Sequence, residues 1–159
     1  MEKDGCWLML HRVKKKNDAN HDKWIGVGGK VEPGESPDVC VQREVREETG
    51  LTLTDWRYRG LVHFVSDVWP SEEMHLYTAT GWTGTMVQGD ACAEGVLEWV
   101  PAEKADELPI WEGDKVFLRL LRENAPLFEL TLNYHGEQLA DWQLDRAPQL
   151  GGINQKPVE

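Results

Sequence analysis

The amino-acid sequence predicts an α+β domain. Stretches in which apolar and polar residues alternate, as in β-strands, lie on both sides of a helix-like segment at residues 37–49, and an amphipathic helix-like segment follows near the C-terminal end. The chain has 159 residues, of which 40% are hydrophobic, enough for one domain with a substantial core. We therefore expect a single domain over residues 1–145 and a loose C-terminal tail over residues 146–159, a segment that contains two prolines.

The N-terminal part predicts a strand at residues 6–12 (CWLMLHR). Before it, Lys3-Asp4-Gly5 is a hairpin-turn signal, yet no strand-like stretch precedes that turn. Either the chain begins late or the sheet is short by one strand. Residues 13–23 form a polar, charged loop, in which Lys14 to Lys16 are either solvated charges or help to attract phosphate.

A glycine-rich loop at residues 24–31 (WIGVGGKV) leads towards the first helix, and its glycines allow close backbone approach. Ser36 suits the N-cap, Pro37 the first helical position and Gly50 the position just past the end. These residues predict a helix over residues 37–49. Further elements are expected in this order: strands at 56–66, 74–82 and 95–100, a helical turn at 101–107, a helix ending near 123, and a hairpin of 128–134 with 139–144.

Three glutamates share one face of the predicted helix. Glu44, Glu47 and Glu48 stand at positions i, i+3 and i+4, in the same arc as Cys40 and Val41. A plain surface helix would place its acids opposite its apolar stripe. Carboxylates that lie next to the buried face of a helix need a compensating positive charge. Hard divalent cations, which prefer oxygen ligands, supply such a charge. This pattern favours a metal site, and the alternative is a solvated acidic face.

The charge distribution limits the function classes. The formal net charge is −11, and no part of the chain has the basic stripe typical of nucleic-acid binding. An acidic protein can still act on a polyphosphate that arrives with metal ions.

Three scattered cysteines (Cys6, Cys40, Cys92) without metal-ligand spacing are typical of free thiols in a reducing cytoplasm. Because no apolar run is long enough for a signal peptide or a membrane span, we expect a cytoplasmic protein.

Residues 29–51 (GKVEPGESPDVCVQREVREETGL) resemble the complete signature of the Nudix hydrolases, and we call them the Nudix box. The stretches CWLMLHR, EGVLEWVP and LPIWEGDKVFLRLL are similar to the MutX branch of MutT-like enzymes, so the resemblance covers about residues 5–145. It implies the Nudix fold, an α/β/α sandwich with a mixed sheet. It also implies hydrolysis of 8-oxo-dGTP or a related purine triphosphate to the monophosphate and pyrophosphate, with Mg²⁺ or alternatively Mn²⁺, as a nucleotide-pool-sanitising reaction.

The resemblance also implies roles for individual residues. The expected metal ligands are the Gly28 carbonyl and the carboxylates of Glu44, Glu47, Glu48 and Glu94. Glu44 and Glu94 both remain candidates for the general base. Arg43 is expected to hold a box carboxylate through a bidentate pair, and the residues expected to support the structure are Gly29, Glu35 and Gly50.

The substrate-binding residues implied by the resemblance are Arg12, Trp24, Lys30, Trp111 and Asp114. Arg12 and Lys30 would contact phosphate, while Trp111 would stack on the base and Asp114 would hydrogen-bond to it. Two positions depart from the pattern: Ile25 replaces a base-reading asparagine, and Gly113 replaces one of two neighbouring aspartates. The alternative for Trp111 is a core aromatic. The expected partner is a nucleoside triphosphate, with no nucleic acid or membrane, and the protein is expected to be a monomer or homodimer.

Two alternatives to this function remain. ADP-ribose or dinucleoside polyphosphate hydrolysis is the nearest, although Ser66 and Asp67 stand where ADP-ribose pyrophosphatases resemble one another in a proline. Val68 and Trp69 likewise stand near the position where dinucleoside polyphosphate hydrolases tend to have a tyrosine. A non-catalytic nucleotide-sensing domain is the second alternative, but such domains usually lose box carboxylates, and this chain keeps all of them.

Overall fold

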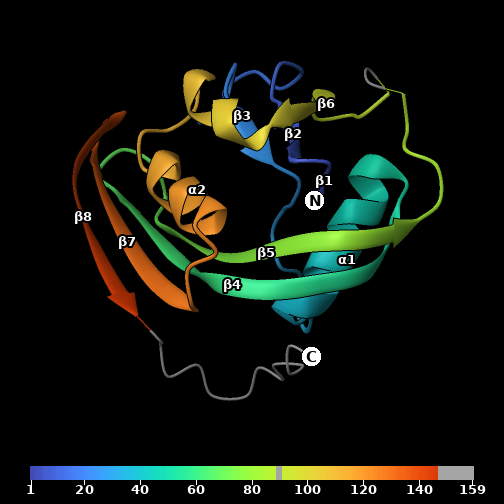
Figure 1. Ribbon diagram of the computed structural model, residues 1–159. Coiled ribbons are helices and arrows are strands. Elements are labelled where there is room, and N and C mark those ends of the chain that lie inside the picture. Colours follow the sequence, from blue (N-terminus) through green and yellow to red (C-terminus); the bar gives the residue numbers. More distant parts are fainter. Residues whose placement is uncertain (89–90, 147–159) are drawn as a thin grey trace. The chain divides into compact units, whose positions relative to one another are not determined.

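The computed structural model describes residues 1–88 and 91–146 of the chain (Figure 1). The elements are β1 (Glu2–Lys3), β2 (Cys6–His11), β3 (Trp24–Gly26), α1 (Pro37–Thr49), β4 (Thr52–Ser66), β5 (Glu72–Thr83), β6 (Val96–Pro101), the 3₁₀ helix η1 (Ala102–Glu107), α2 (Asp114–Arg122), β7 (Phe128–His135) and β8 (Gln138–Arg146). The predicted α+β class is confirmed. The tail predicted for 146–159 lies outside the described residues, apart from Arg146 at the end of β8.

Two compact units make up the chain. The first comprises Met1–Trp56 and Ala79–Trp111, and the second comprises Arg57–Thr78 and Glu112–Glu159. The Nudix box and Glu94 belong to the first unit, whereas Asp114 belongs to the second. The single domain expected over residues 1–145 stays a prediction.

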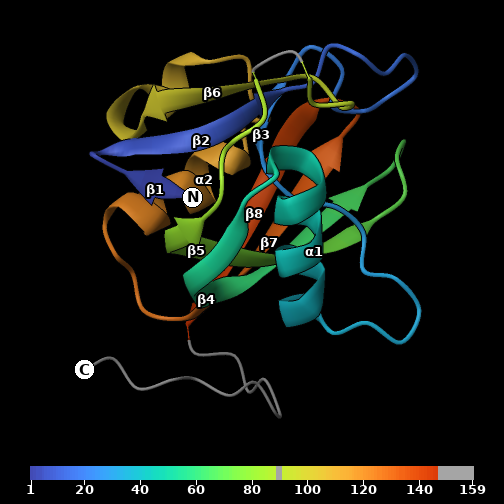
Figure 2. The ribbon, with the colours of Figure 1, turned by 90° about the vertical axis from the view of Figure 1, so that its right-hand side faces the viewer.

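Strand β2 is the centre of the first sheet. It pairs antiparallel with β1 and β3 along one edge and with β6 along the other, and Figure 2 shows it between β1 and β6. The expectation that no strand precedes the first turn is wrong, because Glu2 pairs with Trp7 and Lys3 with Cys6. Asp4 and Gly5 both have positive φ, 51° and 73°, as a tight hairpin turn requires. A strand of two residues is too short to show an alternating pattern.

Helix α1 forms over the predicted residues. The Ser36 hydroxyl accepts a hydrogen bond from the Val39 N–H (3.2 Å), and Gly50, with φ of 78°, donates its N–H to the Arg46 carbonyl (2.9 Å). Val45 is buried in a cluster of apolar residues that also contains Leu51, Leu53 and Ala79. This packing fixes the rotation of the helix, and as a result Glu48, one turn after the Glu44–Val45 pair, is also buried.

The second sheet has the strand order β5-β4-β7-β8 and is mixed, since β4 and β7 run parallel and β7 and β8 antiparallel. Figure 1 shows β7 and β8 side by side. Every second residue of β7 is buried, with Phe128, Leu130 and Leu132 at most 1% exposed. The observed strands begin earlier than predicted at β4 and β5, and the predicted loop at residues 24–31 contains strand β3.

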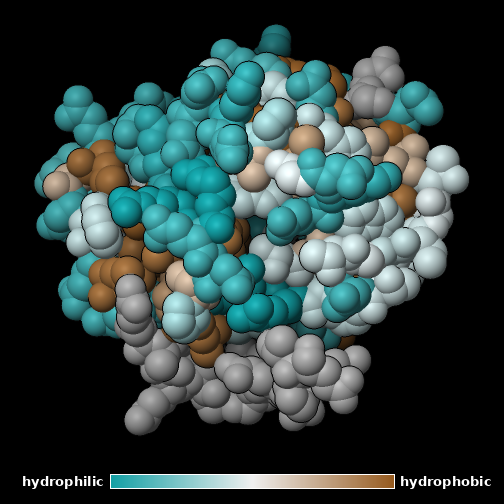
Figure 3. Space-filling view, viewed as in Figure 1, coloured by the Kyte–Doolittle hydropathy of each residue, from teal (hydrophilic) through white to brown (hydrophobic). Residues whose placement is uncertain are grey.

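The visible face in Figure 3 is mainly hydrophilic, with smaller apolar areas. The exposed large apolar side chains are spread along the chain: Val13, Val31, Val39, Val65, Val68 and Trp142. Within the part of the chain that the structure describes, no helix combines the length and apolar character needed to cross a membrane.

Candidate functional site

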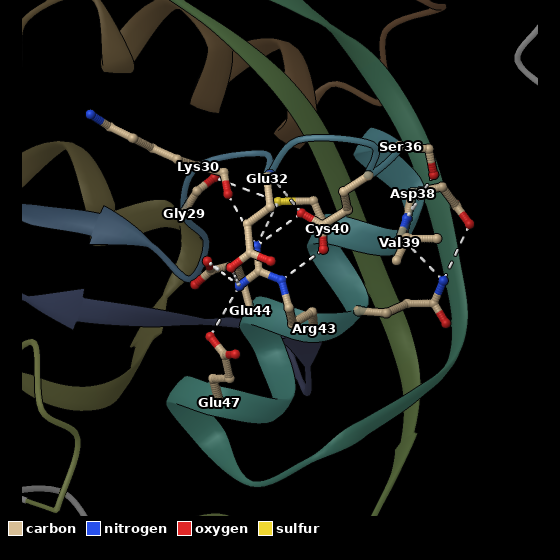
Figure 4. A network of polar contacts seen from close by, with 12 residues as sticks. Gly29, Lys30, Glu32, Ser36, Asp38, Val39, Cys40, Arg43, Glu44 and Glu47 are labelled. Carbon is tan, nitrogen blue, oxygen red and sulfur yellow. Dashed lines mark hydrogen bonds and ion pairs between the residues drawn. The ribbon is translucent and has the colours of Figure 1, made fainter.

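Arg43 is the centre of a polar network at the Nudix box (Figure 4). Its Nε and Nη2 donate to the two carboxylate oxygens of Glu35, at 2.7 and 3.0 Å. Its Nη1 donates to Glu44 (2.8 Å) and Glu47 (3.1 Å), and Nη2 also donates to the Lys30 carbonyl (3.1 Å). One guanidinium therefore ties the loop before the helix to two of the predicted metal ligands.

Glu35 links the loop before α1 to the helix through its hydrogen bonds with Glu32 and Arg43. The hydrogen bonds from Arg43, followed by the backbone N–H of Glu32 (2.9 Å), lower the pKa of Glu35 to about 2. The hydrogen bonds that Arg43 donates to Glu35, and then those to Glu44, raise the pKa of Arg43. The Glu35–Arg43 pair therefore stays ionised at neutral pH, and it holds Arg43 in place beside Glu44.

Gly29 lies directly against the Glu44 carboxylate. A Cβ atom at position 29 would overlap with the carboxylate carbon and both oxygens of Glu44. Glycine at this first position of the box therefore leaves room for the acidic side chain, rather than providing a positive φ. Gly50 serves differently, because it ends α1 in the left-handed conformation.

Glu48 is the buried acid of the site, at 8% exposure. Its Oε2 accepts a hydrogen bond from the Gly28 N–H (3.2 Å). Burial raises its pKa to about 7, and the negative charges of Glu44 and Glu94 act in the same direction. The charges of Glu44 and Glu94 thus oppose a further negative charge on the desolvated Glu48 carboxyl, and carboxylate oxygens are the donors that a hard divalent cation prefers.

The predicted ligands are not gathered into a finished coordination shell. Among residues 1–88 and 91–146, no three His, Cys, Asp or Glu side chains are grouped closely enough to hold a metal ion. Glu44 and Glu47 instead contact Arg43, and Glu48 contacts the Gly28 backbone. The donor chemistry of these carboxylates fits a divalent cation.

Metal binding by the nucleotide-free protein should strengthen as pH rises towards about 7, because the metal needs Glu48 ionised. Burial raises the pKa of Glu48 in the folded protein, so the neutral carboxyl group favours folding. This contribution to the free energy of unfolding is fully present below the unfolded-state pKa near 4.5 and is lost as pH rises through about 7. Calorimetric Mg²⁺ titrations in two buffers of different ionisation enthalpy would measure the proton released. Affinity and proton release that do not change between about pH 5 and 7 would contradict this.

Glu94 lies beside the start of the loop that follows β2. Its Oε2 forms ion pairs with Arg12 Nη1 (3.0 Å) and Lys15 Nζ (2.8 Å). Arg12 also pairs with Asp18 (2.7 Å), and Lys14 Nζ donates to the Cys92 carbonyl (2.7 Å). The sequence predicted roles for Arg12 and Glu94 and an alternative phosphate-attracting role for Lys14 to Lys16, but it did not predict Asp18 or the pairing of Lys15 with Glu94. A charged loop carries no local signal of its distant partners.

The predicted aromatic residues both have close neighbours from the first unit. The Trp24 ring stacks on His11, with centroids 4.6 Å apart and planes 6° apart. Trp111 is only 5% exposed, its indole N–H donates to Asn20 Oδ1 (2.8 Å), and Lys23 Nζ lies 4.5 Å from its ring centroid. Lys23 is therefore in position for a cation–π interaction. The burial of Trp111 favours the alternative that its side chain is a core aromatic.

The other two predicted substrate residues lie at exposed or partly exposed positions. Lys30 is exposed on the loop before α1, and Asp114 is the partly buried first residue of α2. Two hollows of about 310 and 270 Å³ belong to the second unit, one lined by residues that include Asp67, Tyr134 and His135 and the other by residues that include His63. None of the predicted site residues lines either hollow.

Comparison with known proteins identifies the family of this chain. Residues 1–121 match the family model of the NUDIX domain. A relative named "Uncharacterized Nudix hydrolase YvcI", from Bacillus subtilis (strain 168), is 33% identical over 127 residues, which cover 77% of this chain and 79% of that protein. The oxidized purine nucleoside triphosphate hydrolase of Danio rerio is 28% identical over 109 residues, 67% of each chain.

A solved structure, that of the MutT protein of Bacillus halodurans, superposes with a TM-score of 0.78 at 28% identity and covers 91% of this chain and 93% of that one. The predicted resemblance to MutT-like proteins is thus confirmed at the level of the fold. Nudix hydrolases act on nucleotide substrates and generally use divalent metal ions, which the carboxylates around Glu48 suit. The chain therefore belongs to the Nudix family and is a hydrolase of pyrophosphate bonds.

Proposed function

We propose that this protein is a Mg²⁺-dependent pyrophosphohydrolase of oxidised purine nucleoside triphosphates such as 8-oxo-dGTP, releasing the monophosphate and pyrophosphate. The observation that carries the proposed chemistry is the buried Glu48 carboxylate beside the charges of Glu44 and Glu94. The similarity to the Danio rerio oxidized purine nucleoside triphosphate hydrolase supports the substrate class. We place the reaction in the cytoplasm, on free nucleotides, which suits the free thiols of Cys6, Cys40 and Cys92.

A bound divalent ion supplies charge neutralisation at the phosphates and lowers the pKa of a bound water. Glu44, Glu47, Glu48, Glu94 and the Gly28 carbonyl would hold such ions. Arg43 restricts the directions in which Glu44 and Glu47 can point, because its Nη1 contacts both. Either Glu44 or Glu94 accepts the proton of the attacking water, and Arg12 and Lys30 stabilise negative charge on the phosphates.

Turnover measurements over several substrates test this function. The purified protein would be assayed with Mg²⁺ on 8-oxo-dGTP, dGTP, ADP-ribose and diadenosine tetraphosphate, with product identification and an EDTA control. We expect the largest kcat/KM for 8-oxo-dGTP, with pyrophosphate as a product. A larger kcat/KM for ADP-ribose or the dinucleotide would favour those activities, and nucleotide binding without turnover would indicate a sensing domain.

Replacing Trp111 by alanine should lower kcat/KM for purine triphosphates more than for pyrimidine triphosphates, if the indole contributes to base recognition. Trp111 is buried, so the substitution will also reduce stability. The ratio of the two specificity constants removes that effect, because both are measured on the same folded fraction. An unchanged ratio would assign Trp111 to the core alone.

A further inference from the structure

The loop between β2 and β3, residues 12–23, is closed at its base and braced inside. The Arg12 N–H donates to the Lys23 carbonyl (2.9 Å), and the Asp22 N–H donates to the Arg12 carbonyl (2.7 Å). Within the loop, Arg12 Nε donates to Asp18 Oδ2 (2.8 Å). These hydrogen bonds hold the backbone of the loop, and its lysine side chains extend from that backbone.

The loop is also attached to the segment that carries Glu94. Lys14 Nζ donates to the Cys92 carbonyl, and strand pairing places His11 opposite Val96. A Cβ atom at Gly95 would overlap with the His11 carbonyl oxygen, so the two backbones approach closely there. Glu94 is thus held next to the first residues of the loop by main-chain contacts as well as by charge.

Two cations share one oxygen of Glu94. Within the described part of the chain, the ion-pair partners of Glu94 are Arg12 and Lys15, both on Oε2, an atom shielded from solvent. The two cations differ in freedom: the Arg12 side chain is 13% exposed and also paired with Asp18, whereas the Lys15 side chain is 54% exposed. Lys15 can therefore leave Glu94 by side-chain rotation alone, while Arg12 is fixed.

We propose that Lys15 is a substrate-binding residue, which pairs with Glu94 in the nucleotide-free protein and with a substrate phosphate when nucleotide binds. This inference rests on the proposed function, in which Glu94 binds metal. While Lys15 is paired with Glu94 it competes with a divalent cation for Oε2. When a metal-bound polyphosphate enters, Glu94 turns to the metal and the Lys15 ammonium pairs with a phosphate oxygen, so that each charge keeps an opposite partner throughout.

The variant Lys15→Met tests the exchange, because it keeps most of the aliphatic stem and removes the charge. Calorimetric titration of the nucleotide-free protein with Mn²⁺ should show metal affinity raised about two- to fivefold, the range of an exposed ion pair. In steady-state assays KM for the nucleotide should rise by a similar factor with kcat unchanged, as expected when uniform binding is lost. Lys15→Arg, which keeps the charge, should restore both values.

Lys16→Met is the matched control, since it removes the same charge from the neighbouring position of the same loop. It should leave both metal affinity and KM at the wild-type values. Equal effects of Lys15→Met and Lys16→Met, or weaker metal binding in Lys15→Met, would overturn the exchange. The metal titration contains no nucleotide, and KM is measured with whichever nucleotide the protein hydrolyses. A wrong substrate assignment would therefore not change the outcome of this test, and the two proposals can fail independently.

Discussion

Replacing Glu48 by glutamine is expected to lower kcat with Mg²⁺ by about 100-fold or more. This loss equals or exceeds the largest loss expected when a residue that only supports a metal ligand is replaced. The side chain is buried and accepts a hydrogen bond from the Gly28 N–H, which the glutamine carbonyl can also accept. Glutamine keeps the volume but removes the charge that a divalent cation requires. The measurements are kcat and the calorimetric Mg²⁺ affinity.

The metal-free Glu48→Gln protein should be at least as stable as the wild type at neutral pH, because burial opposes ionisation of Glu48. Thermal unfolding would check this. Glu123→Gln, which removes an exposed carboxylate paired with Arg119, serves as the control and should leave kcat unchanged. Glu47→Gln should lower kcat, as Glu48→Gln does. Wild-type turnover in the Glu48 variant would remove this residue from the metal site.

Gly29→Ala is expected to lower kcat/KM by about 10- to 100-fold, the range seen when the support of a metal ligand is lost. The new methyl group would occupy the position of the Glu44 carboxylate. The end of a flexible side chain can move at small cost to folding, but here the group that moves is a predicted metal ligand. Activity should therefore fall much more than the melting temperature, which circular dichroism would record.

Gly26→Ala is the matched control for this change. Gly26 and Gly29 both have backbone conformations open to alanine, but a Cβ at Gly26 meets no atom within 4 Å. Its kcat/KM should equal that of the wild type. If Gly29→Ala were as active as Gly26→Ala, the observed position of Glu44 would have no catalytic importance.

Helix α1 shows how much of the site could be predicted locally. Its N-cap Ser36, its first residue Pro37 and its C-cap Gly50 act through contacts with residues at most four positions away, so their effects could be predicted without the fold. The spacing of Glu44, Glu47 and Glu48 likewise follows from helical geometry alone. The short strands β1 and β3 were missed because two or three residues cannot show a period.

The sequence by itself determined the ends of α1, its acidic face and the identity of the Nudix box. Only the tertiary structure decided that Glu48 is buried, that Arg43 contacts both Glu44 and Glu47, and that Lys15 reaches Glu94. The physical reason is the range of the contacts. Pairing of β2 with β6 brings two distant loops together, and packing of Val45 sets the rotation of α1, so neither result can be deduced from neighbouring residues.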